Sequence, residues 1–316
     1  MPNRRLTLVT TTVLASALTL SACGSDKPAK PTGPLKDITV TGGSATKAPA
    51  VTVKPKPLSV TETTTRTVKE GTGKAVSGKE IVTLRYELIN ATTGTKLEDN
   101  YGKQTLGLNL GESGLLPGLS KGLKGAKTGS QVLVAMPPKD AFGDQGNSQA
   151  KIGAKDTVLF LFDVLGTTTP LAQATGTPVA PKAGLPVVKW TKDKPATFTM
   201  PKTAAPKSTV IQPLIQGAGP AVKAGQTVRV TYTGAIWSTG KVFDSSANSE
   251  KKYFEFPVGQ GQVIKGWDKG IEGQKVGSRL LLVVPPADGY GSKGASQAGI
   301  KGTDTLVFVV DLLAAY

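Results

Sequence analysis

The sequence predicts an α+β fold that occurs twice, each copy being a curved antiparallel β-sheet wrapped over one short α-helix. Short runs of alternating or continuous apolar residues, rich in β-branched side chains, predict strands at 227–232, 279–284 and 305–313. Glycine and proline punctuate the remainder, and 266–271 is the one plausible helix of this copy. Strands that pair around a single helix indicate the α+β class, and an internal repeat indicates that the fold is present twice.

The repeat is visible as residue matches at a nearly constant offset. Residues 82–86 match 228–232 at an offset of 146, whereas Gly143 matches Gly291 at an offset of 148. The offset changes within 98–111, which predicts a loop insertion of two residues in the second copy.

Repeat boundaries and composition divide the 316 residues into five segments. We expect a lipoprotein signal peptide at 1–22, a Pro- and Lys-rich tether at 23–57, an N-terminal domain at 58–168, a linker at 169–207 and a C-terminal domain at 208–316. Trp190 and Phe198 indicate that part of the linker packs on a neighbouring domain.

The N-terminus is predicted to be a targeting segment. Arg4 and Arg5 precede an apolar stretch at 6–20 that is too short to span a bilayer. Leu20-Ser21-Ala22-Cys23 resembles a bacterial lipobox, and an ordinary signal peptide with a cysteine by chance is the alternative. Because Cys23 is the only cysteine in the chain, we expect it to be lipidated. The protein would then be secreted and lie at the extracytoplasmic side of the cell membrane, associated through the lipid anchor only.

Composition excludes several function classes. The net charge is +16, and the stretches 23–70 and 167–216 contribute +4 and +5 of it. Positive and negative charges in the predicted folded parts are therefore nearly balanced. This distribution argues against nucleic acid as a partner. It fits a tether near an anionic envelope surface, or simply a soluble, extended linker. The chain has no histidine, which excludes Ser-His-Asp and Cys-His catalysis and imidazole metal sites, and we expect no metal and no cofactor.

Apolar and aromatic side chains gather beside turns in the second copy, in a chain with 5% aromatic residues. They are Tyr232, Phe243, Phe254, Phe256, Val263, Ile264, Trp267, Tyr290 and Phe308. Phe256 alternates with Phe254 on one predicted strand, which favours the core for Phe256. For the others the pattern fits either core or pocket.

Six sequence blocks in the second copy occur in a familiar order. They include Tyr232-Thr233-Gly234, 240–246, 262–267, Gly289-Tyr290-Gly291 and 305–308. Across 213–316 they resemble the FKBP family of macrolide-binding immunophilins. The resemblance implies a peptidyl-prolyl cis-trans isomerase, a foldase that acts on proline-containing polypeptide clients and that macrolides inhibit.

The resemblance also implies a site. The catalytic residues would be Tyr232, Phe243, Asp244, Ile264, Trp267, Tyr290 and Phe308, with Phe254, Val263 and Ile300 binding substrate. Trp267 would form the pocket floor, the Ile264 N–H would donate to a ligand carbonyl, and Tyr290 would donate from the rim. The stretch 292–301 departs from the family pattern because it lacks the usual prolines.

Isomerisation needs no acid, base or metal. Rotation about an X–Pro bond must pass a barrier of roughly 20 kcal/mol because planarity preserves the double-bond character of the amide. Twisting lowers the charge separation of the amide. Compared with water, a dry aromatic pocket would therefore favour the twisted form over the planar form.

The first copy has the same frame with altered contents. Its equivalent site residues are Tyr86, Leu97, Glu98, Leu116, Leu119, Phe142 and Phe160. The aromatic wall has become largely aliphatic, so we expect a folded domain with a degenerate site. Two alternatives stay open. Both copies could form a chaperone or binding module with incidental isomerase activity, or the first copy could be a spacer or a dimer surface.

Overall fold

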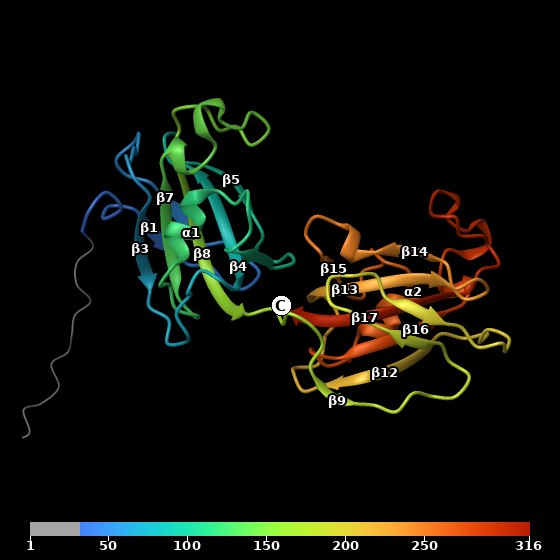
Figure 1. The fold of residues 1–316 in the computed structure, drawn as a ribbon. Helices are drawn as coiled ribbons and strands as arrows, with labels where there is room; N and C mark the ends of the chain where they lie inside the picture. The colour runs from blue at the N-terminus through green and yellow to red at the C-terminus, as the bar shows by residue number, and fades with distance from the viewer. Residues whose placement is uncertain (1–31) are drawn as a thin grey trace, which may run out of the picture.

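The computed structural model describes residues 32–316, so the predicted signal peptide and Cys23 lie outside the described residues. Two domains follow one another along the chain, and in each of them a twisted antiparallel sheet packs against one short helix (Figure 1). This arrangement confirms the predicted α+β class and the predicted repeat. Between residues 32 and 316, no helix is long and apolar enough to cross a membrane.

The sheet of the second domain has seven strands in the order β14-β13-β17-β16-β12-β9, with β15 paired to β13. Its elements are β9 (Gly176–Pro178), β12 (Val210–Gly217), β13 (Thr227–Ile236), β14 (Val242–Ser245), β15 (Phe254–Pro257), α2 (Lys265–Ile271), β16 (Arg279–Val284) and β17 (Leu306–Ala315).

The sheet of the first domain has six strands in the equivalent order β3-β7-β8-β4-β5, with β6 paired to β4. Its elements are β3 (Thr64–Lys69), β4 (Ile81–Asn90), β5 (Thr95–Asp99), β6 (Leu106–Asn109), α1 (Pro117–Leu123), β7 (Gln131–Met136) and β8 (Val158–Thr168).

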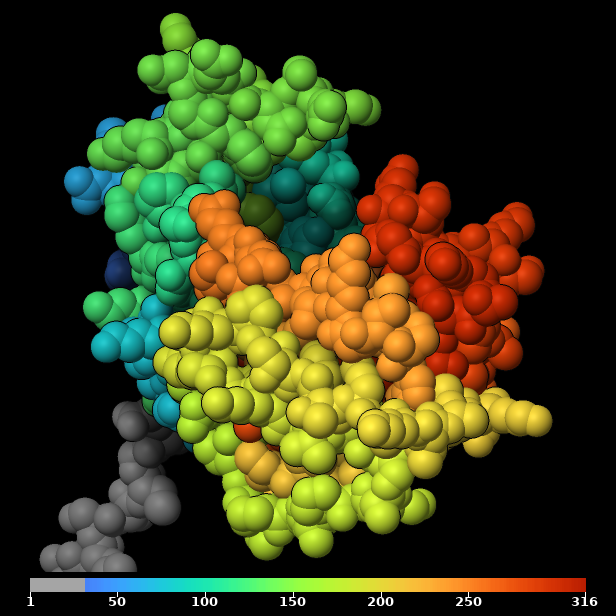
Figure 2. Space-filling model, turned by 45° about the vertical axis from the view of Figure 1, so that its right-hand side comes forward, coloured from blue at the N-terminus to red at the C-terminus, as the bar shows by residue number. Residues whose placement is uncertain are grey.

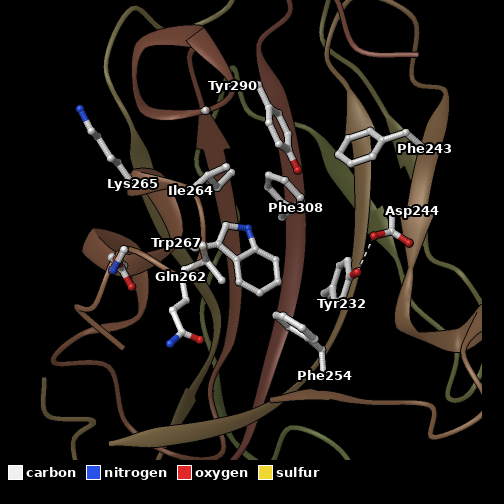
Figure 3. Close-up of a pocket in the computed structure, with 14 residues that line it drawn as sticks. Tyr232, Phe243, Asp244, Phe254, Gln262, Ile264, Lys265, Trp267, Tyr290 and Phe308 are labelled. Atoms are coloured by element: carbon white, nitrogen blue, oxygen red, sulfur yellow. Dashed lines mark hydrogen bonds between the residues drawn. The ribbon is translucent and has the colours of Figure 1, made fainter. Parts of the chain in front are cut away.

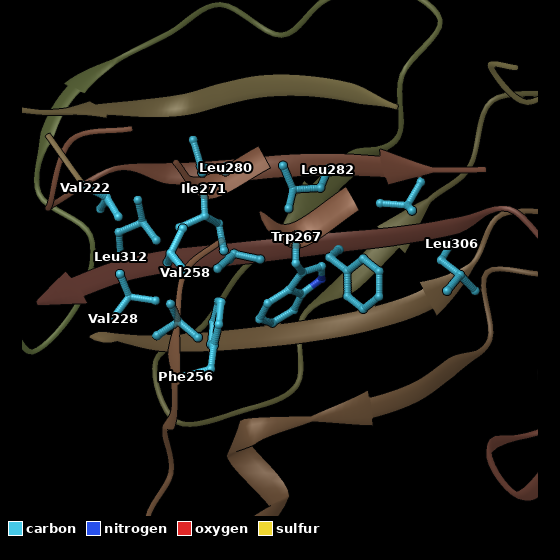
Figure 4. Close-up of a cluster of buried hydrophobic side chains, with 14 of the residues drawn as sticks. Val222, Val228, Phe256, Val258, Trp267, Ile271, Leu280, Leu282, Leu306 and Leu312 are labelled. Carbon is cyan, nitrogen blue, oxygen red and sulfur yellow. The ribbon is translucent and has the colours of Figure 1, made fainter. Parts of the chain in front are cut away.

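The central strands of both sheets are apolar on both faces, because every second residue points to the opposite side. In β16, Leu280, Leu282 and Val284 face α2 and belong to the main core of the second domain (Figure 4). Leu281 and Val283, between them, face the other way and are 1% and 0% exposed. Each sheet therefore needs a cover on both sides.

Helix α2 covers one side and lies close to the sheet, because two of its residues are glycines that face β16. A Cβ atom added at Gly266 would lie 2.5 Å from Cγ1 of Val284, and one added at Gly270 would lie 3.0 Å from Cδ2 of Leu282. The helix ends before Gly273, whose φ of +79° favours glycine.

Two stretches expected to be extended connections cover the opposite sides. Within the described part of the predicted tether, β1 (Thr39–Thr41) and β2 (Ala50–Thr52) pair as a hairpin. The predicted linker at 169–207 supplies the edge strand β9 and a hairpin of β10 (Val187–Lys189) and β11 (Thr197–Thr199). The structure thus differs from the expectation of an extended tether at 23–57, and it gives the linker more strand structure than was expected. Their apolar residues stand too far apart among prolines and lysines to give a periodic pattern.

The β10–β11 hairpin and its flanking residues bury the second apolar face of the C-terminal sheet. Figure 2 shows this segment, in yellow-green to yellow, spread over one face of the second domain. The covering side chains are Leu185, Val188, Phe198, Met200 and Ala205, which pack with Val210 and Leu214 of β12 against Trp237, Leu281, Val283 and Val307. The predicted packing of Phe198 on a neighbouring domain is confirmed.

A fragment that begins at residue 208 should therefore be less stable than one that begins at 169. Removing 169–207 would expose apolar side chains of the sheet, so we expect the free energy of unfolding to fall by at least about 2 kcal/mol. Urea unfolding of 208–316 and 169–316, with binding of a hydrophobic dye as a second readout, checks this. Equal midpoints would show that the cover contributes nothing to stability.

Candidate active site

A cavity of about 650 Å³ opens in the second domain between α2, strands β13 and β14, and the turn that carries Tyr290 (Figure 3). Its lining consists of Tyr232, Phe243, Asp244, Phe254, Gly261, Gln262, Val263, Ile264, Lys265, Trp267, Asp268, Gly289, Tyr290 and Phe308. The structure brings together all but one of the predicted site residues. The exception is Ile300, which is 3% exposed and packs in the main core of the domain.

Trp267 forms the floor of the cavity. The indole projects from α2, is only 4% exposed, and meets the rings of Tyr232 and Phe308 edge to face at centroid distances of 5.1 and 5.3 Å. Its buried Nε1–H has no hydrogen-bond partner among the described residues. Phe256 supports the indole at 5.5 Å from within the core, in agreement with the core position expected for it. The floor is therefore a flat, rigid apolar surface.

Gly234, near the C-terminal end of β13, makes room for the aromatic wall. A Cβ atom at this position would lie 2.7 Å from Cζ of Phe243 and 2.8 Å from Cε1 of Phe308. These two rings meet edge to face at 5.7 Å. This glycine belongs to the Tyr232-Thr233-Gly234 motif but was not predicted as a site residue. A glycine inside a predicted strand often marks a place where another group approaches the backbone closely, and this pattern could have indicated its role.

Tyr232 and Asp244 form the polar side of the cavity. The Tyr232 hydroxyl donates to Oδ2 of Asp244 at 2.5 Å, drawn as a dashed line in Figure 3. Burial, together with this bond and the charge of Asp244, raises the pKa of Tyr232 above its ordinary value. Burial and the same carboxylate also raise the pKa of Tyr290. Both hydroxyls are therefore held in the protonated, donating form.

The loop before α2 is fixed by a residue that sequence analysis did not assign to the site. Asp268 in α2 accepts the N–H of Gly259 at 2.8 Å and the N–H of Gly261 at 3.0 Å. This loop presents Val263 and Ile264 at the cavity, where the Ile264 N–H donates to no group of residues 32–316. A free N–H beside an apolar floor can bind a carbonyl oxygen.

The rim of the cavity is accessible to a large ligand. Tyr290 is 43% exposed and Phe254 is 40% exposed, although both are large and mainly apolar. They stand at opposite sides of Trp267 in Figure 3. The cavity is therefore open to a polypeptide segment from outside, while the Trp267 side chain at its floor is only 4% exposed.

The first domain keeps the polar pair of this site and loses its aromatic wall. The Tyr86 hydroxyl donates to Oε1 of Glu98 at 2.9 Å, and burial, followed by this bond, raises the pKa of Tyr86 to about 12. Leu88 stands where the second domain has Gly234, is only 6% exposed, and belongs to the same apolar cluster as Leu97. A side chain thus occupies the position that the glycine leaves open.

The remaining predicted residues of the first site also lie in this cluster. Leu116, Leu119, Phe142 and Phe160 pack together around α1 and β8. Phe160 stacks on Phe162 at a centroid distance of 5.0 Å, so its ring is held by the core. The two sites are built on the same strands and helix of the fold, while their side chains differ.

A sheet wrapped over a short helix, with an aromatic cavity at the end of that helix, defines an immunophilin-like binding domain. The sequence model of the FKBP-type peptidyl-prolyl cis-trans isomerase family matches residues 71–165 and 219–313, which together exceed half of the chain. The chain belongs to this family and is an FKBP-type peptidyl-prolyl cis-trans isomerase.

Individual relatives match one copy of the repeat. An FK506-binding protein of Streptomyces anulatus is 45% identical over 109 residues, which cover 34% of this chain and 87% of the relative. FK506-binding protein 4 of Mycosarcoma maydis is 42% identical over 127 residues, which cover 40% of this chain and only 32% of that protein. The structure of the three FKBP domains of wheat FKBP73 covers 80% of this chain and 94% of that one at 21% identity, with a TM-score of 0.34.

The isomerase activity should be insensitive to pH across the neutral range. The chain contains no histidine, and the raised pKa values of Tyr232 and Tyr290 keep both hydroxyls protonated well above neutrality. We expect kcat/KM to stay within about twofold between about pH 6 and pH 9. Initial rates on one Xaa-Pro peptide across this range check it. A bell-shaped profile centred near pH 7 would contradict an active site without acid–base catalysis.

Proposed function

We propose that the second domain isomerises Xaa-Pro bonds of extracytoplasmic polypeptides by binding the twisted amide in its aromatic cavity. The observation that carries the proposal is a cavity of about 650 Å³ lined by six aromatic rings, with Trp267 buried at its floor. A proline ring fits flat against the indole, and the exposed rim leaves room for the chain on either side of it.

Desolvation supplies the catalysis. The planar amide has the larger charge separation, so water stabilises it more than it stabilises the twisted form. Moving the bond onto the apolar floor removes part of that ground-state stabilisation and lowers the barrier to rotation. The free N–H of Ile264 can hold the carbonyl of the client in place. An apolar residue before the proline would be preferred because its neighbours in the cavity are apolar.

The first domain is proposed to bind clients and to isomerise them poorly. Leu88 fills space that is open at Gly234, and Leu97 and Leu119 replace two rings of the second site. The domain keeps a folded core and a Leu106 that is 38% exposed, at the position equivalent to Phe254 of the second site. These features support the alternative of a binding module more strongly for the first copy than for the second.

Combined Phe243→Ala and Asp244→Ala substitutions should lower kcat/KM of the whole chain at least about tenfold, which corresponds to a loss of about 1.4 kcal/mol of transition-state stabilisation. The reason is that one variant removes an aromatic wall and the acceptor of Tyr232. A protease-coupled assay on an Ala-Leu-Pro-Phe peptide measures it.

The matched control makes the same changes in the first domain. Leu97→Ala with Glu98→Ala should alter the activity of the whole chain by less than about twofold, because that site contributes little. Circular dichroism confirms folding of both variants. Unchanged activity in the folded 243/244 variant would rule out the second site, and a large loss in the 97/98 variant would make this a two-site enzyme.

We further propose that the protein is anchored at the extracytoplasmic face of the cell membrane through lipidated Cys23. The motif Leu20-Ser21-Ala22-Cys23 in a chain with one cysteine supports this. Cys23→Ser should leave uncleaved precursor or release the protein from the membrane fraction, because serine lacks the thiol to which the lipid would be attached. Fractionation followed by immunoblotting checks it, and normal processing with membrane retention would overturn the anchor.

A further inference from the structure

The hairpin on the far side of the second sheet is connected to the active site by a chain of hydrogen bonds. The N–H of Ala196 donates to Oγ1 of Thr233 at 3.0 Å. Thr233 Oγ1 lies 3.1 Å from Oγ of Ser245, and Ser245 Oγ donates to the carbonyl of Tyr232 at 3.0 Å. Because each hydroxyl has a single proton, Thr233 donates to Ser245 and the chain runs in one direction. Thr233 and Ser245 are 2% and 3% exposed.

These bonds act where two strands of the active site cease to pair regularly. Thr233 pairs with Ser245 and Gly234 with Asp244, and the register shifts immediately afterwards. On the other side of the Thr233–Ser245 pair, where the pairing of β13 with β14 ends, the N–H of Tyr232 donates to Oγ of Ser246 at 3.0 Å. Hydroxyl groups thus continue the contact between the two strands at Tyr232, whose side chain reaches diagonally to Asp244.

The hairpin is firmly seated, so it can hold its end of this chain in place. Trp190, just after β10, stacks on the guanidinium of Arg279 with 3.8 Å between Cζ and the ring centroid. Arg279 in turn forms two bonds to Asp311, at 2.6 and 2.8 Å. The recess left between the hairpin and the strands measures about 20 Å³, which is about the space of one water molecule.

The first domain lacks this connection. Glu87 stands at the position of Thr233 and Asp99 at that of Ser245, so no hydroxyl chain can form. Burial raises the pKa of Glu87, and its Oε2 has no hydrogen-bond partner among the described residues. The connection therefore occurs in the domain with the aromatic cavity and is absent from the domain without one.

We propose that Thr233 and Ser245 are positioning residues for the isomerase, which tie the β10–β11 hairpin to the Tyr232–Asp244 pair and hold that pair in its catalytic geometry. The inference rests on the proposed function of the second cavity. It makes the segment 169–207 a working part of the enzyme, although this segment lies on the face of the sheet opposite the cavity.

Thr233→Val removes the central hydroxyl and preserves the shape of the side chain. In the chain from residue 32 onward we expect kcat/KM to fall about three- to tenfold, because a small displacement of a positioned group is costly in catalysis. Thr233→Ser keeps the hydroxyl and should restore at least half of the lost activity. The Cζ carbon resonance of Tyr232, assigned with Tyr232→Phe, should move in Thr233→Val and return in Thr233→Ser, which a general loss of stability would not produce.

Thr231→Val is the matched control. Thr231 lies two residues earlier on β13 and is partly buried, and its buried hydroxyl has no hydrogen-bond partner among residues 32–316. We expect unchanged activity and an unchanged Tyr232 resonance. If the folded Thr233→Val variant retains wild-type activity and the wild-type Tyr232 resonance, the positioning role is wrong. A loss of activity that Thr233→Ser does not restore would also overturn it. Wild-type activity in the Phe243→Ala, Asp244→Ala variant would instead reject the proposed function itself.

Discussion

Each sheet of this protein is apolar on both faces, and most of the architecture follows from the need to cover both. The continuous buried run of β16 and β17 cannot face water on either side. On one side a helix of only seven residues covers the sheet incompletely, and Trp267 closes the remaining gap from below. The aromatic cavity is the part of that side which stays open. On the other side a hairpin from the preceding segment completes the burial.

The two covers share the same strands, which links structural elements that lie on opposite faces. β13 carries Tyr232 toward the cavity and Thr233, the next residue, toward the hairpin. A substitution on the face covered by the hairpin can therefore affect the cavity face, because adjacent residues of one strand lie on the two faces. The cavity and the hairpin that supports it therefore lie on opposite faces of the sheet, although neighbouring residues of β13 contact both.

The two copies of the repeat share their backbone fold and differ in the side chains of the site. Asp140 accepts Thr63 and Lys121 in the first domain, and Asp288 accepts Thr209 and Lys269 in the second, so one strand-to-helix tie occurs in both. Hydrogen bonds to Lys121 and Thr63 lower the pKa of Asp140, and those to Thr209 and Lys269 lower the pKa of Asp288. Such ties hold a helix in place without specifying what lines the cavity. The frame can therefore persist while the leucines of one copy replace the rings of the other.

The sequence by itself determined the fold class, the duplication, the strands at 227–232 and 279–284, the short helix and nine of the fourteen residues that line the cavity. Strand alternation, glycine positions and family motifs are local or ordered along the chain, so they can be read without coordinates. Only the tertiary structure decided the rest: that Ile300 belongs to the core and not to the cavity lining, that Gly234 admits two rings, and that 169–207 covers a sheet. These depend on which surfaces meet in space, and contacts between distant segments leave no periodic pattern in the chain that forms them.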